Sequence, residues 1–151
     1  MKNYHHIETI QTSEGISIVD LNDDINNAIK HSRVTEGFAI ISSRHTTTAV
    51  CINEYEERLL VDIKDWLQKL APANNKYLHN DIDQRDCPPD EPENAHSHLM
   101  AMLLGSSETI PVTSRKLALG EYQSVLLLDL DGPRERTVNI QIIGEDKKSW
   151  E

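Results

Sequence analysis

Apolar and polar residues alternate along several short stretches of the chain, which is the pattern of half-buried β-strands. The expected strands are 4–12, 16–20, 37–41, 47–52, 109–112, 122–129 and 137–143. The last carries the clearest alternation, with Val138, Ile140 and Ile142 on one face. A turn at Ser13-Glu14-Gly15 joins the first two, so the chain is expected to open with a hairpin.

Apolar residues spaced by three or four positions predict three helices. The first runs to about Ser32, and Asn22 or Asp23 can cap it. Asn53 is the expected N-cap of the second, which ends before Pro72. Its apolar face comprises Leu59, Leu60, Ile63, Leu67 and Leu70. The third covers 94–104 and ends at a glycine.

The order of these elements predicts an α+β fold with mainly antiparallel sheets, because the helices do not alternate regularly with single strands. One domain spanning 1–151 fits the length of 151 residues. A polar segment over 73–93 separates the second and third helices. Loops of this length are uncommon in a compact domain and are often functional.

The formal net charge of −10 argues against binding to nucleic acids or anionic membranes. The first residues, Met1 to Ile7, contain no apolar run, and no later stretch could span a bilayer, so a cytoplasmic protein is expected. In that compartment Cys51 and Cys87 are expected to be free thiols.

Seven histidines provide the first candidates for chemistry. His5 and His6 are neighbours on a strand and are interpreted as surface residues. His31 lies near the end of a helix, where the dipole favours an imidazolium without any function. His45 follows a buried strand within a run of serine and threonine, beside Arg44. These groups are either a phosphate site or a solvated turn.

Two further histidine motifs lie near the third helix. His79 and Asp81 share one side if the segment is extended, and the carboxylate could also orient a ligating imidazole. His96 and His98 diverge by about 200° on a helix, so only one can face a given pocket. His98 has the smaller neighbours and is preferred, while His96 is interpreted as a packed, hydrogen-bonded residue.

Together, His45, His79 and His98 could offer three imidazole nitrogens to a divalent ion, of which zinc is the best match. Such an ion could act as a Lewis acid or activate water. Glu54, at the start of the second helix, is a candidate general acid or base, or simply a carboxylate favoured by the helix dipole.

Six blocks of the chain stand out in order. The blocks are His45-Thr46-Thr47-Thr48-Ala49-Val50 with Asn53-Glu54, Tyr77-Leu78-His79-Asn80-Asp81, Asn94-Ala95-His96-Ser97-His98-Leu99, Ile110-Pro111-Val112, Leu119-Gly120-x-x-Gln123 and Asp131-Gly132-Pro133-Arg134. Together they resemble the YjbQ-like family of secondary thiamine-phosphate synthases. The chain departs from the family at Tyr122 (commonly Trp), Arg115 (usually Gly) and Cys51 (commonly Thr or aliphatic).

The resemblance implies an antiparallel β-sandwich with flanking helices, a homotrimer, and a pocket near a subunit interface. It implies catalytic roles for Glu54, Asp81 and His98, and a metal or polar lining at His45, His79 and His98. It implies substrate binding by Arg44, Thr46, Thr47, Asn53 and Gln123.

Three functions follow from these expectations. The first is weak thiamine-phosphate synthesis, in which a thiazole phosphate displaces pyrophosphate from a pyrimidine methylene carbon. The second is a metal-dependent hydrolase or lyase that uses an activated water. The third is a non-catalytic trimer that binds a small phosphorylated molecule.

Overall fold

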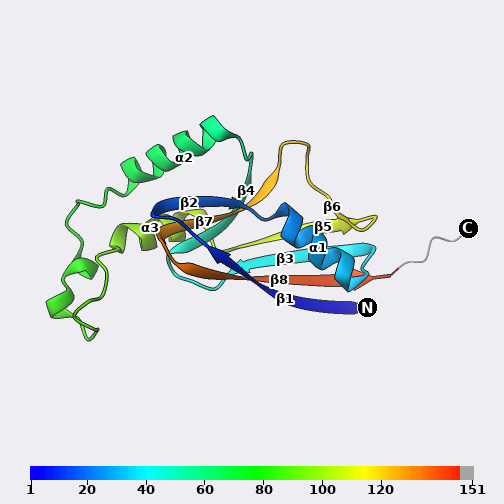
Figure 1. Ribbon diagram of the computed structural model, residues 1–151, viewed down its shortest axis with the longest axis horizontal. Coiled ribbons are helices and arrows are strands. Elements are labelled where there is room, and N and C mark those ends of the chain that lie inside the picture. The colour runs from blue at the N-terminus through cyan, green and yellow to red at the C-terminus, as the bar shows by residue number, and fades with distance from the viewer. Residues whose placement is uncertain (147–151) are drawn as a thin grey trace, which may run out of the picture.

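Two antiparallel sheets and three α-helices form the fold in the computed structural model, which describes residues 1–146 (Figure 1). The larger sheet has the order β1 (Lys2–Gln11), β8 (Glu135–Glu145), β3 (Glu36–Ser43), β5 (Ser107–Thr113) and β6 (Lys116–Leu117). The smaller has the order β2 (Gly15–Asp20), β7 (Ser124–Gly132) and β4 (Thr48–Asn53). The helices are α1 (Asn22–Ser32), α2 (Glu57–Leu70) and α3 (Ala95–Leu104), with short 3₁₀ turns η1 (Leu78–Asn80) and η2 (Ile82–Gln84).

The main core lies between the two sheets. Alternate residues of β8, among them Val138, Ile140 and Ile142, point inward and are fully buried, as their spacing predicts. They pack with Val125 and Leu127 of β7 and with the apolar side of α1. The fold is therefore α+β, with two antiparallel sheets packed face to face, which confirms the predicted class.

A second core covers the other face of the small sheet. Leu126 and Leu128 of β7 point away from the large sheet and meet Leu67 of α2 and Met100 of α3. Because both faces of β7 are covered, every residue from Ser124 to Leu130 is buried. This strand is the centre of the molecule and leads directly into the candidate site.

The starts of two helices differ from their sequence predictions. Glu56, not Asn53, caps α2, and its carboxylate accepts the backbone N–H groups of Arg58 and Leu59. Asn22 is the first residue of α1 instead of its cap, and its side-chain oxygen accepts from the N–H of Val125 at 2.9 Å. In α2 the free backbone N–H groups are already bound by Glu56, so Asn53 is not needed as a cap. In α1 the side chain of Asn22 is already bonded to Val125 and does not cap the helix.

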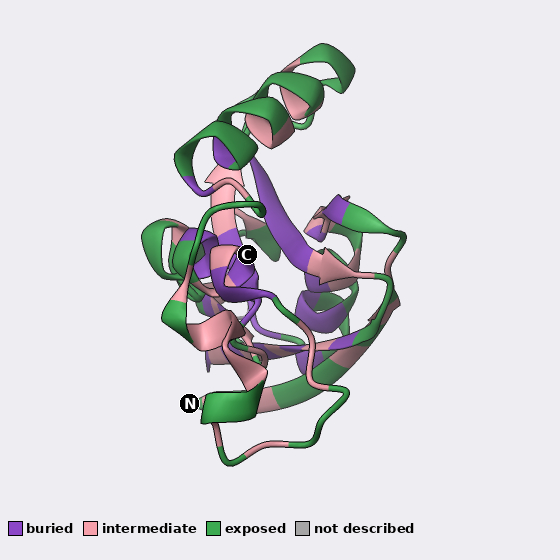
Figure 2. Cartoon of the chain, turned by 90° about the vertical axis from the view of Figure 1, so that its left-hand side faces the viewer, coloured by how far each residue is buried: buried purple, intermediate pink, exposed green. Residues whose placement is uncertain are grey.

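Helix α2 stands away from the sheets (Figure 1) and is mostly exposed at the top of Figure 2. Of its predicted apolar face only Leu67 is fully buried, and Leu70 is 51% exposed. Trp66 is exposed as well. The amphipathic pattern therefore predicts the helix correctly, but this chain alone covers its apolar side only in part.

Candidate functional site: a polar pocket beside helix α3

A polar cavity of about 400 Å³ lies where the loop after β3, the β7–β8 turn and the start of α3 meet. Its walls comprise Arg44, His45, Thr46, Thr47, Glu91, Pro92, Asn94, His98, Asp131, Arg134 and Arg136. Three arginines and two imidazoles thus face two carboxylates. The N-terminus of α3, a helix of ten residues, opens beside them and adds a partial positive charge.

The floor of the cavity is a buried ion pair. Arg136 is 4% exposed and binds the Asp129 carboxylate through two bonds of 2.9 and 2.8 Å. The same guanidinium donates to the hydroxyl of Thr47 at 2.7 Å. Asp129 also accepts from Thr12 at 2.5 Å and from the N–H of Asp131 at 3.0 Å. These bonds fix the guanidinium in one orientation under the pocket.

The remaining arginines of the pocket are less constrained. Arg134 binds Asp131, whose carboxylate also accepts from the amide of Asn94 at 2.7 Å. Arg44 is exposed, and within residues 1–146 its guanidinium makes no hydrogen bond or ion pair. Its five N–H donors are therefore available to a ligand at the mouth of the cavity.

His45 is anchored to the large sheet. Its Nε2 accepts the backbone N–H of Thr137 at 2.9 Å, which places the ring proton on Nδ1. Burial, followed by the charges of Arg136 and Arg44, lowers the pKa of His45 below its ordinary value of 6.5. The ring is neutral at pH 7, with an N–H donor and no charge of its own.

His98 and His79, two of the three imidazoles expected at one site, lie in contact. Their ring centroids are 4.8 Å apart in an edge-on arrangement. Burial first, and His79 second, lower the pKa of His98 below 6.5. The Nε2 atom of His79 is buried and has no hydrogen-bond partner in the described chain. A polar atom in that state costs free energy unless something else binds it.

The three imidazoles do not converge on one point within a single chain. His45 and His98 line the same cavity, and His79 contacts His98, but the Nε2 of His45 already serves the sheet. Over residues 1–146, no group of three or more His, Cys, Asp or Glu side chains is placed to share a metal ion. Within one chain, His79 and His98 lie together and His45 is set apart.

The other predicted residues lie at different places. Thr46 and Thr47 border the cavity beside Arg44. Asp81 follows η1 and is not among the residues that line it. Asn53 pairs with Ser124 at the far end of β4, whereas Thr48 pairs with Asp129 beside the pocket.

Five residues of strand separate those ends by roughly 17 Å. Glu54 and Gln123, the neighbours of Asn53 and Ser124, therefore sit outside this cavity in one chain. A site that used them together with His98 would need a second copy of the chain.

His96 is packed, as its sequence position predicts, but one of its ring nitrogens lacks the expected hydrogen bond within residues 1–146. It is partly buried, as expected for a packed residue, but its buried Nδ1 has no hydrogen-bond partner among residues 1–146. The same holds for the side-chain oxygen of Asn94 at the start of α3. Three unpartnered polar atoms thus gather around this end of the helix.

Two important residues, Asp129 and Arg136, were not identified from the sequence. A usable signal was present, because Arg136 continues the inward-pointing series of Val138, Ile140 and Ile142. A charged residue at an inward position of a strand requires a buried partner. Asp129 lies in the apolar run of β7, where a carboxylate is equally unexpected.

Comparison with known proteins gives a consistent assignment. The family model described as UPF0047 protein YjbQ-like matches residues 6–145. The chain is 36% identical to a UPF0047 protein of Methanothermobacter thermautotrophicus, covering 96% of this chain and 95% of that one. It is 39% identical to a UPF0047 protein of Archaeoglobus fulgidus, over 89% and 98%.

Solved structures agree with the sequence relatives. A YbjQ-like protein of unknown function from Sulfolobus solfataricus superposes with a TM-score of 0.86 at 32% identity, covering 95% of this chain and 99% of that chain. A hypothetical protein from Aeropyrum pernix gives 0.84 at 33%, covering 93% and 98%. The chain belongs to the YjbQ-like UPF0047 family.

Proposed function

We propose that the polar pocket binds a small phosphorylated molecule and that the protein has a weak thiamine-phosphate synthase-type transferase activity. The observation that carries the proposal is the unpaired guanidinium of Arg44 above the locked guanidinium of Arg136, within one cavity. Planar guanidinium groups and hydroxyls bind phosphate oxygens through several charge-assisted hydrogen bonds. The N-terminus of α3 supports the same ligand class.

The transfer reaction makes two demands on the pocket. A ring nitrogen of the thiazole phosphate forms a bond to the pyrimidine methylene carbon, while the bond from that carbon to the pyrophosphate oxygen breaks. Negative charge therefore grows on the leaving pyrophosphate and must be stabilised. Arg44 and the hydroxyls of Thr46 and Thr47 would hold phosphate oxygens, and the neutral ring of His98 would donate or accept a hydrogen bond at the reacting group.

A divalent ion, zinc by the chemistry of its ligands, would bind the Nε2 of His79, which has no hydrogen-bond partner among residues 1–146, beside the ring of His98. Within the same residues no third His, Cys, Asp or Glu joins them, so a further ligand would come from the substrate or from a second copy. Such an ion would supply a counter-charge for pyrophosphate. The same unpartnered atom favours a second candidate function, a metal-dependent hydrolase or lyase. If no turnover occurs with phosphorylated ligands, the protein remains a binding protein for them.

We further propose that the protein acts in the cytoplasm as a homotrimer, without nucleic acid or membrane partners. Large apolar side chains on α2 and α3 remain exposed, including Trp66, Leu103 and Met102, the last at 81%. A second copy would cover such a surface. It could also bring Asn53, Glu54 and Gln123 toward the pocket. No helix of residues 1–146 is both long enough and apolar enough to cross a membrane.

The test combines binding, turnover and metal content. Thiazole phosphate and pyrimidine pyrophosphate are supplied to the wild-type protein and to Arg44→Ala and His98→Ala, and thiamine phosphate is measured. Arg58→Ala, which removes an exposed cation of α2, serves as the matched control. Turnover should fall at least about tenfold in the two pocket variants and persist in the control. Equal turnover in all four proteins would refute the assigned pocket.

Metal analysis separates the two candidate reactions. Protein purified without chelators is analysed for bound metal, and His79→Ala is compared with the wild type. One ion per chain that is lost in the variant, together with hydrolysis of phosphate esters, favours the hydrolase. Formation of thiamine phosphate from the two precursors, without hydrolysis of phosphate esters, favours the transferase.

A further inference from the structure

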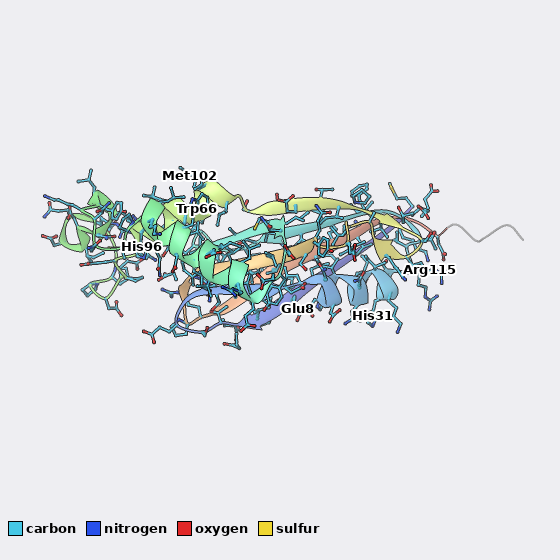
Figure 3. All side chains as sticks on the ribbon, turned by 90° about the horizontal axis from the view of Figure 1, so that it is seen from above. Glu8, His31, Trp66, His96, Met102 and Arg115 are labelled. Atoms are coloured by element: carbon cyan, nitrogen blue, oxygen red, sulfur yellow. The ribbon has the colours of Figure 1, made fainter. Side chains whose placement is uncertain are left out.

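A second cavity, of about 820 Å³, lies at the end of the molecule remote from the polar pocket. It opens between the end of α1 and the β5–β6 turn. Its walls comprise Asn26, Asn27, Ile29, Lys30, Arg33, Arg115, Lys116, Leu117 and Asp146. Figure 3 places Arg115 at one end of the molecule and His96 near the other. Strand β3 connects the two cavities and spans about 23 Å.

Positive charge dominates this cavity, although the chain as a whole is strongly acidic. Of the fifteen Lys and Arg residues of the chain, four line the walls of this cavity: Lys30, Arg33, Arg115 and Lys116. None of these four side chains forms an ion pair within the part of the chain that the structure describes. The single acid of the wall, Asp146, is bonded to Lys2 at 2.8 Å and is also attracted by Arg115 and Arg33, so four cations face one carboxylate.

The backbone holds two of these arginines in an uncommon conformation. Arg33, at the end of α1, has φ 59°, and Arg115, in the β5–β6 turn, has φ 65°. Both lie in the left-handed region, which glycine and asparagine adopt more readily than arginine. The N–H of Arg115 donates to the carbonyl of Thr35 at 3.0 Å, which ties the turn to the segment after α1. The two guanidiniums are therefore carried on opposite, linked walls.

Apolar and amide groups complete the wall. Ile29 is fully buried beneath the cavity, and Leu117 is partly buried at its side. The side-chain amides of Asn26 and Asn27 are exposed on the wall formed by α1 and offer hydrogen-bond donors and acceptors. A ligand with several negative charges and one flat, partly apolar group would match all three kinds of surface.

We propose that this second cavity binds a nucleoside polyphosphate, with the phosphates on Arg33, Arg115 and Lys116 and the base beside Leu117 and the side-chain amides of Asn26 and Asn27. The volume suits a ligand of nucleotide size. Several unpaired cations suit two or more phosphates better than one. This site is separate from the polar pocket, so it does not depend on the function proposed above.

Titration calorimetry of the full-length protein with ATP tests the proposal. The informative variant is Arg115→Gly, because glycine adopts φ 65° without strain and the fold should be kept or slightly stabilised. It should weaken ATP binding by about tenfold or more, as expected for the loss of one charge-assisted contact. Arg115→Lys should retain more of the affinity, and Arg58→Ala on α2 should bind like the wild type.

Each further arm decides a part of the proposal. The affinity should fall steeply with added salt, because several cations contact the phosphates. Inorganic triphosphate should bind more weakly than ATP. Equal affinity for the two ligands would show that the base makes no contact with the cavity. Wild-type affinity in Arg115→Gly, loss of ATP binding in Arg44→Ala, or no binding at about 1 mM ATP would each overturn the second cavity as a nucleotide site.

Discussion

Replacement of Arg136 by methionine tests the ion pair on which the polar pocket rests. The guanidinium is 4% exposed, Asp129 is fully buried, and two short hydrogen bonds join them. Methionine has a similar length but no charge, so it fills the space and leaves the carboxylate without its counter-ion. The hydroxyl of Thr12 and the N–H of Asp131 still bind the carboxylate, but neither carries a positive charge.

The expected loss in the free energy of unfolding is about 3–5 kcal/mol, the cost of removing one partner of a buried pair. A domain of this kind has a total stability of about 5–15 kcal/mol, so the variant should lose a large share of it. Adding Asp129→Asn removes the uncompensated charge and keeps an acceptor for the N–H of Asp131. The double variant should therefore recover about 2 kcal/mol relative to Arg136→Met.

Urea unfolding followed by circular dichroism measures these differences, and pH adds an independent check. Burial alone would raise the pKa of Asp129, but the bonds from Arg136, Thr12 and Asp131 outweigh it and hold the pKa below the ordinary 3.8. The stabilisation is present above pH 3.8 and is lost as the pH falls through the lower folded-state pKa.

In Arg136→Met the folded-state pKa rises, so acid unfolding should begin at a higher pH. A variant within about 0.5 kcal/mol of the wild type, with an unchanged acid transition, would refute the reasoning.

Three other measurements follow from the site and the core. Sulfate, which keeps its charge across this range, should bind more tightly as the pH falls below 6.5, because a bound anion raises the lowered pKa of His98. Calorimetry should show proton uptake, and pH-independent binding would contradict a neutral ring. Burial, with a smaller contribution from Glu108, raises the pKa of Cys51 to about 11. In a Cys87→Ser background this thiol should therefore react with a disulfide reagent about a hundredfold more slowly than a cysteine thiol of ordinary pKa. Fast reaction would show that Cys51 is accessible as the thiolate. Ser97→Ala removes a fully buried hydroxyl that donates to the carbonyl of Leu130 in β7 at 2.5 Å. Thermal unfolding should show that the free energy of unfolding falls by about 1–3 kcal/mol. An unchanged melting temperature would mean that this hydrogen bond is dispensable.

The sequence predicts the strands and helices well because their apolar periodicities are strong. It predicts the helix caps poorly, since a cap depends on which of several nearby polar groups has the better geometry. Asn53 is a good cap by residue type, yet Glu56 reaches the free N–H groups of α2. Which residue caps a helix depends on the path of the preceding loop, and the spacing of apolar residues does not predict that path.

Part of the candidate site could also be predicted. His45 and His98 do line one cavity, and His79 does meet His98. The motif that runs from His45 to Glu54 is contiguous in sequence, but its two ends lie at opposite ends of β4 because a strand is extended. Proximity along the chain therefore suggests a shared pocket that this chain by itself does not form.

The position of β3 has a consequence for ligand binding. Its residues are hydrogen-bonded to β8 on one side and to β5 on the other, and the chain on either side of it enters the two cavities, at Arg33 before the strand and at Arg44 after it. A strand held from both sides has no second arrangement through which occupancy at one end could be felt at the other. The coupling free energy between the two ligands should therefore be close to zero, so that saturating one site leaves the dissociation constant of the other unaltered.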